Sequence, residues 1–469
     1  MAINSLSFIL FFVVLSTFYY GTSVHKQLQN YVLLIANYVF YGFVNWRMAI
    51  FLFIVVGIAY IIGLEIEKNG NRKKITAVGI LLAVGLLAYF KYFNFFIKSF
   101  CHLLENIGLQ ANYHVFNIVV PVGISFFTFR IISYLVEIYR GNVNAEKDFV
   151  VFSNYISFFP AIASGPIDRP NTFLPQLHKA RVFNYDLAVD GTRQILWGLF
   201  KKMVIADNIA NVVDGVWDNY VNEPASSLFW TACLYSIQIY ADFSGYSDMS
   251  IGVGKLMGFN IMKNFEMPYF SRNMSEFWRK WHISLTSWLT DYIYKPLGGS
   301  RCSKYRHLTN LMIVFLISGL WHGADWSFVA WGGFHGVLLI ALVLLKGKKY
   351  NHYISKNRML PSFHELICML VVFLFSSLGW IFFRADSMPD ACSYIVHMLC
   401  NNWLIKPDFH VKIIVFILVM FILEWITRTK EHPLQMNCGQ YMKWGFYLVL
   451  TYMIIYHQGQ STDFIYFKF

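Results

Sequence analysis

Long apolar runs recur along this chain at intervals that suit a protein crossing a bilayer many times. The clearest of them cover residues 5–21, 31–46, 48–64, 75–98, 115–138, 363–383, 412–427 and 443–457. One helical crossing needs about 20 apolar residues. The chain is 57% hydrophobic and only 14% charged, whereas soluble proteins carry about 25% charged residues. We therefore expect an all-α polytopic membrane protein with about eleven transmembrane helices.

Basic residues gather in short clusters between the apolar runs. The formal net charge is +12, which by itself is compatible with nucleic-acid binding. However, Arg72, Lys73 and Lys74 follow the third run, and Arg140 and Lys147 follow the fifth. Cytoplasmic loops of membrane proteins carry such an excess of Lys and Arg. We expect these loops in the cytoplasm and expect no nucleic acid as a partner.

The chain shows no separable soluble region, internal repeat or low-complexity tract. We therefore expect one membrane-embedded domain over residues 1–469. Within it we distinguish N-terminal helices in residues 1–140, a central core in residues 141–345 and C-terminal helices in residues 346–469.

The central core departs from regular spanning helices in two places. The apolar segment Phe149–Ser164 runs into FPAIASGPIDRP, whose prolines and glycine break a helix. Irregular backbone at membrane depth needs protein or water around it, so we expect a re-entrant segment here. Residues 187–206 mix charged and bulky apolar side chains, which is typical of a helix at the membrane interface or packed inside the bundle.

His322 is the first candidate for chemistry, because it lies in GLWHGADW at the end of a short apolar run. Gly319 and Gly323 would let another backbone approach closely, and Trp321 and Trp326 could shield the site from water. A neutral imidazole there can take a proton from an attacking hydroxyl. A buried histidine that only holds helices together fits the local sequence equally well.

His282 and His335 lie in equally apolar surroundings. In WRKWHISLTSWL, Trp278, Trp281 and Leu285 recur with His282 at helical spacing, which predicts one aromatic helix face. An amphipathic helix at the membrane interface would show the same pattern. His335 in GGFHG is better explained by a contact between small residues of two helices, or by a supporting role near the site.

Other chemical signatures are weak in this chain. Asp242 and Asp248 lie in an apolar stretch, where a carboxylate is costly unless it faces the protein interior. HExxH, P-loop and dinucleotide-binding motifs do not occur in a usable context. We expect no metal site, because no histidine pair shows ligand spacing with a carboxylate beside it.

Five stretches, taken together and in order, resemble the membrane-bound O-acyltransferase (MBOAT) superfamily. They are PVGISFFTFRIISYLVEIYRG, FFPAIASGPIDRP, YADFSGYSDMSIGVGKLMGF, FWRKWHISLTSWLTDYIYKPLGGSR, and GLWHGADW with GGFHG. These stretches are most similar in sequence to the bacterial branch of the superfamily. Members of that branch O-acetylate alginate, peptidoglycan or cellulose, or D-alanylate teichoic acid.

The resemblance implies a bundle of spanning, re-entrant and interfacial helices around a central tunnel. The catalytic histidine of the superfamily falls on His322, and its second signature position falls on His282. A supporting or tunnel-lining place is then expected for the remaining candidates, which are His335, Trp281, Arg279, Asp242, Asp291 and Trp321. His282 would orient His322 or donate a hydrogen bond to the thioester oxygen.

The same resemblance suggests substrates and partners. We expect acetyl-CoA as the donor, with no permanently bound cofactor, in the inner (cytoplasmic) membrane of a bacterium. An acyl carrier protein is the alternative donor on the cytoplasmic side. A periplasmic or extracellular acetyltransferase would pass the acetyl group to a polysaccharide. D-alanyl transfer to teichoic acid is the alternative within the enzyme class, and a transporter or channel is the alternative outside it.

Overall fold

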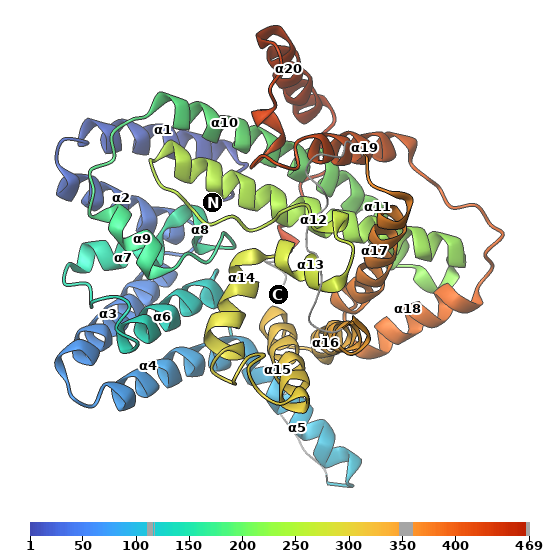
Figure 1. The fold of residues 1–469 in the computed structure, drawn as a ribbon, viewed down its shortest axis with the longest axis horizontal. Coiled ribbons are helices and arrows are strands. Elements are labelled where there is room, and N and C mark those ends of the chain that lie inside the picture. The colour runs from blue at the N-terminus through green and yellow to red at the C-terminus, as the bar shows by residue number, and fades with distance from the viewer. Residues whose placement is uncertain (110–115, 117, 347–359, 466–469) are drawn as a thin grey trace. The chain divides into compact units, whose positions relative to one another are not determined.

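The computed structural model describes residues 1–109, 116, 118–346 and 360–465. Within these ranges the chain forms helices joined by loops and no strand (Figure 1). It divides into two compact units. The first unit is Met1–Thr192 with Ser250–Met262, and the second unit is Arg193–Met249 with Lys263–Phe469. Two helices, α10 (Tyr185–Leu199) and α12 (Ala225–Leu256), contribute residues to both.

The first unit is built mainly from the predicted N-terminal helices. Its elements are α1 (Leu6–Gly21), α2 (Lys26–Gly42), α3 (Trp46–Lys68), α4 (Arg72–Leu87), the π-helical η1 (Ala88–Tyr92), α5 (Phe93–Asn106), α6 (Ile124–Tyr139), α7 (Phe149–Ser157), α8 (Phe159–Ile162) and α9 (Pro170–Leu177). The predicted run 115–138 begins outside the described residues, and α6 accounts for its later part.

The second unit contains all three candidate histidines. Its elements are η2 (Phe200–Ala206, π-helical), α11 (Asp207–Trp217), η3 (Tyr220–Asn222), η4 (Pro268–Phe270), α13 (Met274–Lys280), α14 (Ile283–Leu289), η5 (Thr290–Tyr294, π-helical), α15 (Lys304–His322), α16 (Trp326–Lys346), α17 (Phe363–Arg384), α18 (Met388–Cys400), α19 (Val411–Ile426), η6 (Pro433–Gln435) and α20 (Gln440–Tyr456).

Four of the described helical segments are long and apolar enough to cross a membrane. They are Trp46–Lys68, Arg72–Asn106, Trp326–Leu345 and Phe363–Arg384. The all-α membrane-protein class is therefore confirmed. Helices also form at the other predicted runs within the described residues, but the number of about eleven crossings stays a prediction.

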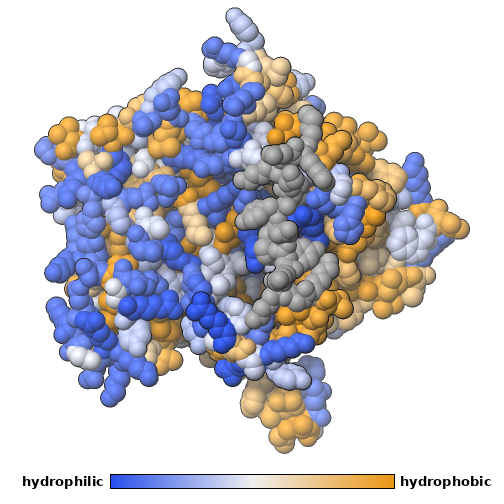
Figure 2. Space-filling model, viewed as in Figure 1, coloured by the Kyte–Doolittle hydropathy of each residue, from blue (hydrophilic) through white to orange (hydrophobic). Residues whose placement is uncertain are grey.

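Apolar side chains on the outer faces of several helices fit a bilayer environment. Phe96, Phe100 and Leu103 on α5 are exposed, as are Val396 and Leu399 on α18. Figure 2 shows the corresponding orange surfaces over these two helices. A protein in water would have to cover apolar surface of this kind, whereas lipid tails solvate it.

The predicted irregular segment is broken as expected and is stabilised by a buried arginine. The chain leaves helical geometry between α7 and α8, and α9 begins only at Pro170. Arg130 of α6 donates to the carbonyl oxygens of Tyr155 and Ile156, at 3.2 and 3.3 Å, and to that of Pro166 at 3.1 Å. These bonds satisfy backbone oxygens that a broken helix leaves without partners.

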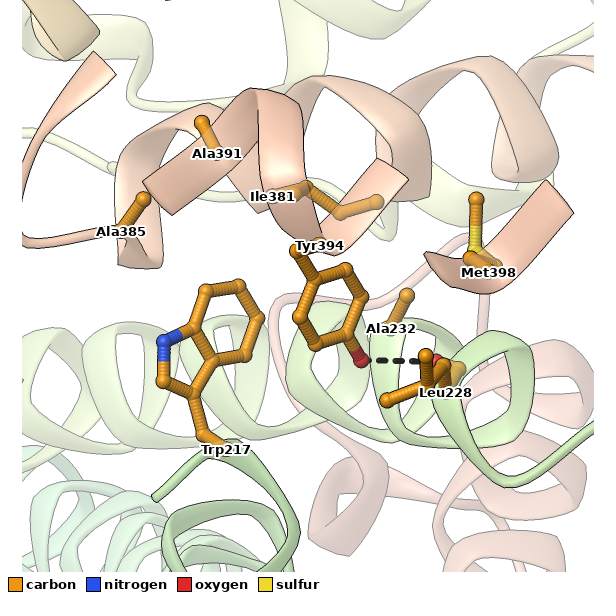
Figure 3. Packing of buried hydrophobic residues seen from close by; sticks show 8 residues of the cluster. All are labelled: Trp217, Leu228, Ala232, Ile381, Ala385, Ala391, Tyr394 and Met398. Atoms are coloured by element: carbon orange, nitrogen blue, oxygen red, sulfur yellow. Dashed lines mark hydrogen bonds between the residues drawn. The ribbon is translucent and has the colours of Figure 1, made fainter. Parts of the chain in front are cut away.

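Part of the second unit's core lies where α11, α12, α17 and α18 meet. Trp217 stacks on Tyr394 with ring centroids 4.2 Å apart, and the Tyr394 hydroxyl donates to the Leu228 carbonyl at 2.8 Å (Figure 3). Ile381 and Ala391 pack around the same ring pair. The tyrosine buries its ring and still satisfies its hydroxyl, as buried tyrosines usually do.

Candidate active site

A close crossing of α15 and α16 positions His322. A Cβ atom on Gly319 would collide with the Phe328 carbonyl oxygen, and one on Gly332 would collide with the Phe315 carbonyl oxygen. Small residues permit such a close approach of two helices. The predicted close approach of another backbone is confirmed at Gly319. At Gly323 the close neighbour is instead the side-chain ring of Phe328.

His322 is the last residue of α15, and the chain then turns into extended backbone at Gly323. Its side chain is buried, with 3% of the residue exposed. Three aromatic rings stand roughly edge-on to the imidazole: Trp321 at 4.8 Å, Trp331 at 4.9 Å and Phe383 at 5.2 Å between centroids. This environment excludes bulk water and favours a defined ring orientation.

His282 lies at a break between two short helices, which corrects the predicted single helix face. Helix α13 ends at Lys280, Trp281 is extended, and His282 has φ 44° and ψ 54°. Left-handed backbone is uncommon outside glycine and clusters at functional sites. Helical spacing in the sequence could not reveal this break, because no proline or glycine marks it.

Imidazole and indole rings alternate along a row through the second unit. His282 contacts Trp321 at 5.9 Å, Trp321 contacts His322, His322 contacts Trp331, and Trp331 contacts His335 at 5.0 Å, between ring centroids. The structure thus brings together the three histidines and the predicted Trp321. Trp331 completes the row and was missed, although it lies in the same aromatic-rich stretch. Trp326, which was predicted to shield His322, is 56% exposed.

His335 is fully buried on α16 and packs against a second helix. A Cβ atom on Gly379 of α17 would lie 2.7 Å from its Nε2 atom, and Trp278 stands edge-on at 5.0 Å. Neither ring nitrogen makes a hydrogen bond with the described residues. This placement matches the predicted contact between small residues of neighbouring helices.

The other predicted residues lie in different surroundings. Trp281 is fully buried and packs against Trp380, which in turn contacts Trp331. Arg279 is exposed. Asp291 pairs with exposed Lys295 at 2.6 Å. Their predicted tunnel-lining role has no direct support in the described contacts.

Asp242 is part of a buried charged network that the sequence only partly indicated. Lys202 Nζ lies 2.7 Å from Asp242 Oδ1 and 2.9 Å from Asp207 Oδ1. The neighbouring Lys201 Nζ lies 2.6 Å from Asp248 Oδ2. Consecutive lysines in an apolar stretch were the available signal, because such charges are stable only when paired.

A late segment of the chain completes this network. Ile465 donates its backbone N–H to Asp242 Oδ2 at 2.9 Å, and the Thr462 hydroxyl donates to Asp207 Oδ1 at 2.8 Å. Phe464 stacks on Tyr246 at 4.8 Å and contacts Phe243 at 5.8 Å between centroids. Phe243 in turn stands edge-on to His282 at 4.6 Å. Phe243 therefore contacts both His282 of the histidine row and Phe464 of the segment that completes the charged network.

Comparison with known proteins decides the family. The model of the membrane-bound O-acyltransferase family matches residues 145–373. A probable alginate O-acetylase AlgI of Pseudomonas aeruginosa is 37% identical over 374 residues, covering 78% of this chain and 69% of the relative. A peptidoglycan O-acetyltransferase of Helicobacter pylori is 32% identical over 399 residues, covering 79% and 73%.

The chain belongs to the membrane-bound O-acyltransferase family.

A less similar relative has a different name. A teichoic acid D-alanyltransferase of Bacillus subtilis is 28% identical over 288 residues, covering 58% of this chain and 71% of the relative. The chain is therefore an acyltransferase, and His282, His322 and His335 all lie within the region that the family model matches. The transporter or channel alternative loses its basis, because the shared sequence is that of enzymes.

Proposed function

We propose that this acyltransferase moves an acetyl group from cytoplasmic acetyl-CoA across the membrane for O-acetylation of an extracytoplasmic polysaccharide. The observation that carries the proposal is the enclosed row of histidines and indoles within the region of family identity. The similar proteins are named for acetylation of alginate and of peptidoglycan, and both names point to a saccharide hydroxyl as the final acceptor.

His322 is proposed as the general base or proton relay. A thioester is already activated, so the site must hold donor and acceptor together, remove one proton and stabilise the oxyanion. A positioned imidazole contributes about 10²–10⁴ in rate to such a proton transfer. The edge-on rings of Trp321, Trp331 and Phe383 keep water away from the thioester, which would otherwise hydrolyse it.

The surrounding architecture is proposed to be one membrane-embedded domain with about eleven crossings around a tunnel, in the cytoplasmic membrane of a bacterium. CoA enters from the cytoplasmic side, and a separate acetyltransferase outside receives the acetyl group and modifies the polysaccharide. D-alanyl transfer from a carrier protein is the second candidate, favoured by the match to teichoic acid D-alanyltransferase over 58% of this chain.

The test uses purified protein in liposomes with radiolabelled acetyl-CoA added on one side. Wild type, His322→Ala and His282→Ala are compared, with His364→Ala on the exposed face of α17 as the matched control. We expect wild type and control to consume acetyl-CoA and His322→Ala to lose at least about 100-fold in rate. Full activity of a folded His322→Ala protein would contradict the assignment, and use of only an aminoacyl carrier would favour the second candidate.

A further inference from the structure

The side chain of Asn264 lies against His282 and two groups at the start of α14. Its Oδ1 atom is 3.0 Å from His282 Nδ1, 2.9 Å from the Ser284 hydroxyl oxygen and 3.3 Å from the Ser284 backbone nitrogen. Its Nδ2 atom donates to the Ser247 hydroxyl at 3.2 Å. All four residues are buried in the second unit.

These contacts determine which way the Asn264 amide points. A backbone N–H can only donate a hydrogen bond, so the amide atom that faces the Ser284 nitrogen must be the oxygen. The same oxygen faces His282 Nδ1, which must therefore carry a hydrogen. In a neutral imidazole only one nitrogen is protonated. The lone pair of a neutral His282 consequently lies on Nε2.

Asn264 also caps the start of α14, because the residue at the N-cap position does not. His282 occupies the N-cap position, but its side chain makes no capping bond. Instead the Ile283 backbone N–H donates to the Asn264 carbonyl oxygen at 2.8 Å, and the Ser284 N–H donates to Oδ1. The first N–H groups of a helix need such acceptors. The left-handed backbone of His282 and the orientation of its ring are thus held by the same residue.

We propose that Asn264 is a positioning residue that fixes His282 as the Nδ1–H tautomer, so that neutral His282 accepts a hydrogen bond or proton at Nε2 and cannot donate one to the thioester oxygen. The sequence left open whether His282 orients His322 or donates a hydrogen bond to the thioester oxygen. The geometry argues against donation by neutral His282, because its Nε2 atom is an acceptor. The catalytic part of the inference rests on the proposed function. The tautomer itself does not.

The first measurement is nitrogen NMR of ¹⁵N-histidine-labelled protein in membranes, at a pH where histidine is neutral. Subtracting the spectrum of His282→Gln assigns the His282 signals. We expect a protonated Nδ1 and an unprotonated Nε2 in wild type, and a mixture of tautomers in Asn264→Leu. An Nε2–H tautomer in wild type would overturn the proposal, whatever substrate the enzyme uses.

The second measurement is the pH dependence of the rate in Asn264→Asp. A carboxylate keeps the acceptor for Nδ1–H and the Ser284 groups, and the Ser247 hydroxyl can turn to donate to it. The added charge favours protonated His282, because an opposite charge within about 4–6 Å shifts such an equilibrium by about 1–3 pH units. The acid side of the kcat profile should therefore move to higher pH by at least about one unit.

Nearby titratable groups and a matched variant make this shift interpretable. The Trp321 ring contacts both His282 and His322, while Asp242 and Asp248 on α12 are already paired with lysines. Asn273→Asp is the control, since Asn273 caps α13 by accepting from Glu276 N–H at 2.9 Å, a role that aspartate also fills. An unshifted profile in a folded Asn264→Asp protein would overturn the positioning role, whereas failure of wild type to use acetyl-CoA would affect only the proposed donor.

Discussion

Lys202 and Asp242 form an ion pair inside the second unit, with 2.7 Å between Nζ and Oδ1 and side chains only 6% and 2% exposed. Lys202 lies on η2 and Asp242 lies on α12, 40 positions later in the chain. Lys202 also pairs with a second carboxylate, with 2.9 Å between its Nζ atom and Asp207 Oδ1. One cation thus holds two carboxylates in place, and loss of Lys202 would leave both buried carboxylates without that cation.

Lys202→Met should therefore destabilise the protein strongly. Removing one partner of a buried ion pair costs about 3–5 kcal/mol, and two aspartates would lose their cation here. The apparent melting temperature in detergent measures the effect. Lys295→Met is the control, because that pair with Asp291 is largely exposed and should matter by less than about 1 kcal/mol. Equal melting temperatures for both variants would contradict the importance of the buried network.

Gly319→Ala should lower both stability and activity. The added methyl group collides with the Phe328 carbonyl oxygen, so α15 must move away from α16 and carry His322 with it. Overpacking of this kind costs about 1–3 kcal/mol. Gly333→Ala on α16 is the matched control, since its Cβ would make an ordinary contact with Leu316 at 3.7 Å. Thermal unfolding and acetyl-CoA turnover of the two variants should differ clearly, and similar behaviour would argue against a tight crossing.

Trp331→Ala should make the enzyme hydrolyse more of its thioester, although the indole itself transfers no proton. The indole lies between His322 and His335, so its removal opens a cavity that admits water and loosens both imidazoles. Truncation of a buried tryptophan costs about 3–5 kcal/mol. We expect a higher ratio of thioester hydrolysis to acyl transfer, measured as free acetate against transferred label. Trp444→Ala on the exposed face of α20 should leave that ratio unchanged.

Gly459→Leu should displace the late segment that supports the charged network and Phe243, the neighbour of His282. A Cβ at Gly459 would lie 2.5 Å from the Asp207 carbonyl carbon, so the segment that carries Thr462 and Phe464 must shift. The shift removes acceptors and donors from the charged network, and a lower melting temperature should accompany reduced turnover. Gly445→Leu provides the control, because nothing lies within 4 Å of its added Cβ. Matching results for the two variants would show that the segment does not support the site.

Hydropathy and glycine pattern predicted much of the framework because they report local physics. The length of an apolar run predicted α3 and α17, and the glycines of GLWHGADW predicted a close helix crossing. The prolines of FPAIASGPIDRP predicted broken backbone, and the structure has it.

Long-range partners could not be predicted in the same way. The break at His282 depends on Asn264, which accepts hydrogen bonds from residues about twenty positions later. The Tyr240 hydroxyl donates to Glu424 at 2.9 Å, although the two residues are 184 positions apart. No pattern near either residue indicates the other as its partner. Charged residues in apolar runs indicated that partners must exist, but only the fold identifies them.

The placement of residues 459–465 has a consequence for biosynthesis. Asp207 and Asp242 are synthesised first, whereas the hydroxyl of Thr462 and the N–H of Ile465 that complete their surroundings follow more than 200 residues later. During translation the carboxylates must be held by Lys202 alone or remain hydrated. The nascent second unit is therefore immature until its last described segment has left the ribosome, and a chain that stops before Gly459 is an expected substrate for membrane quality control.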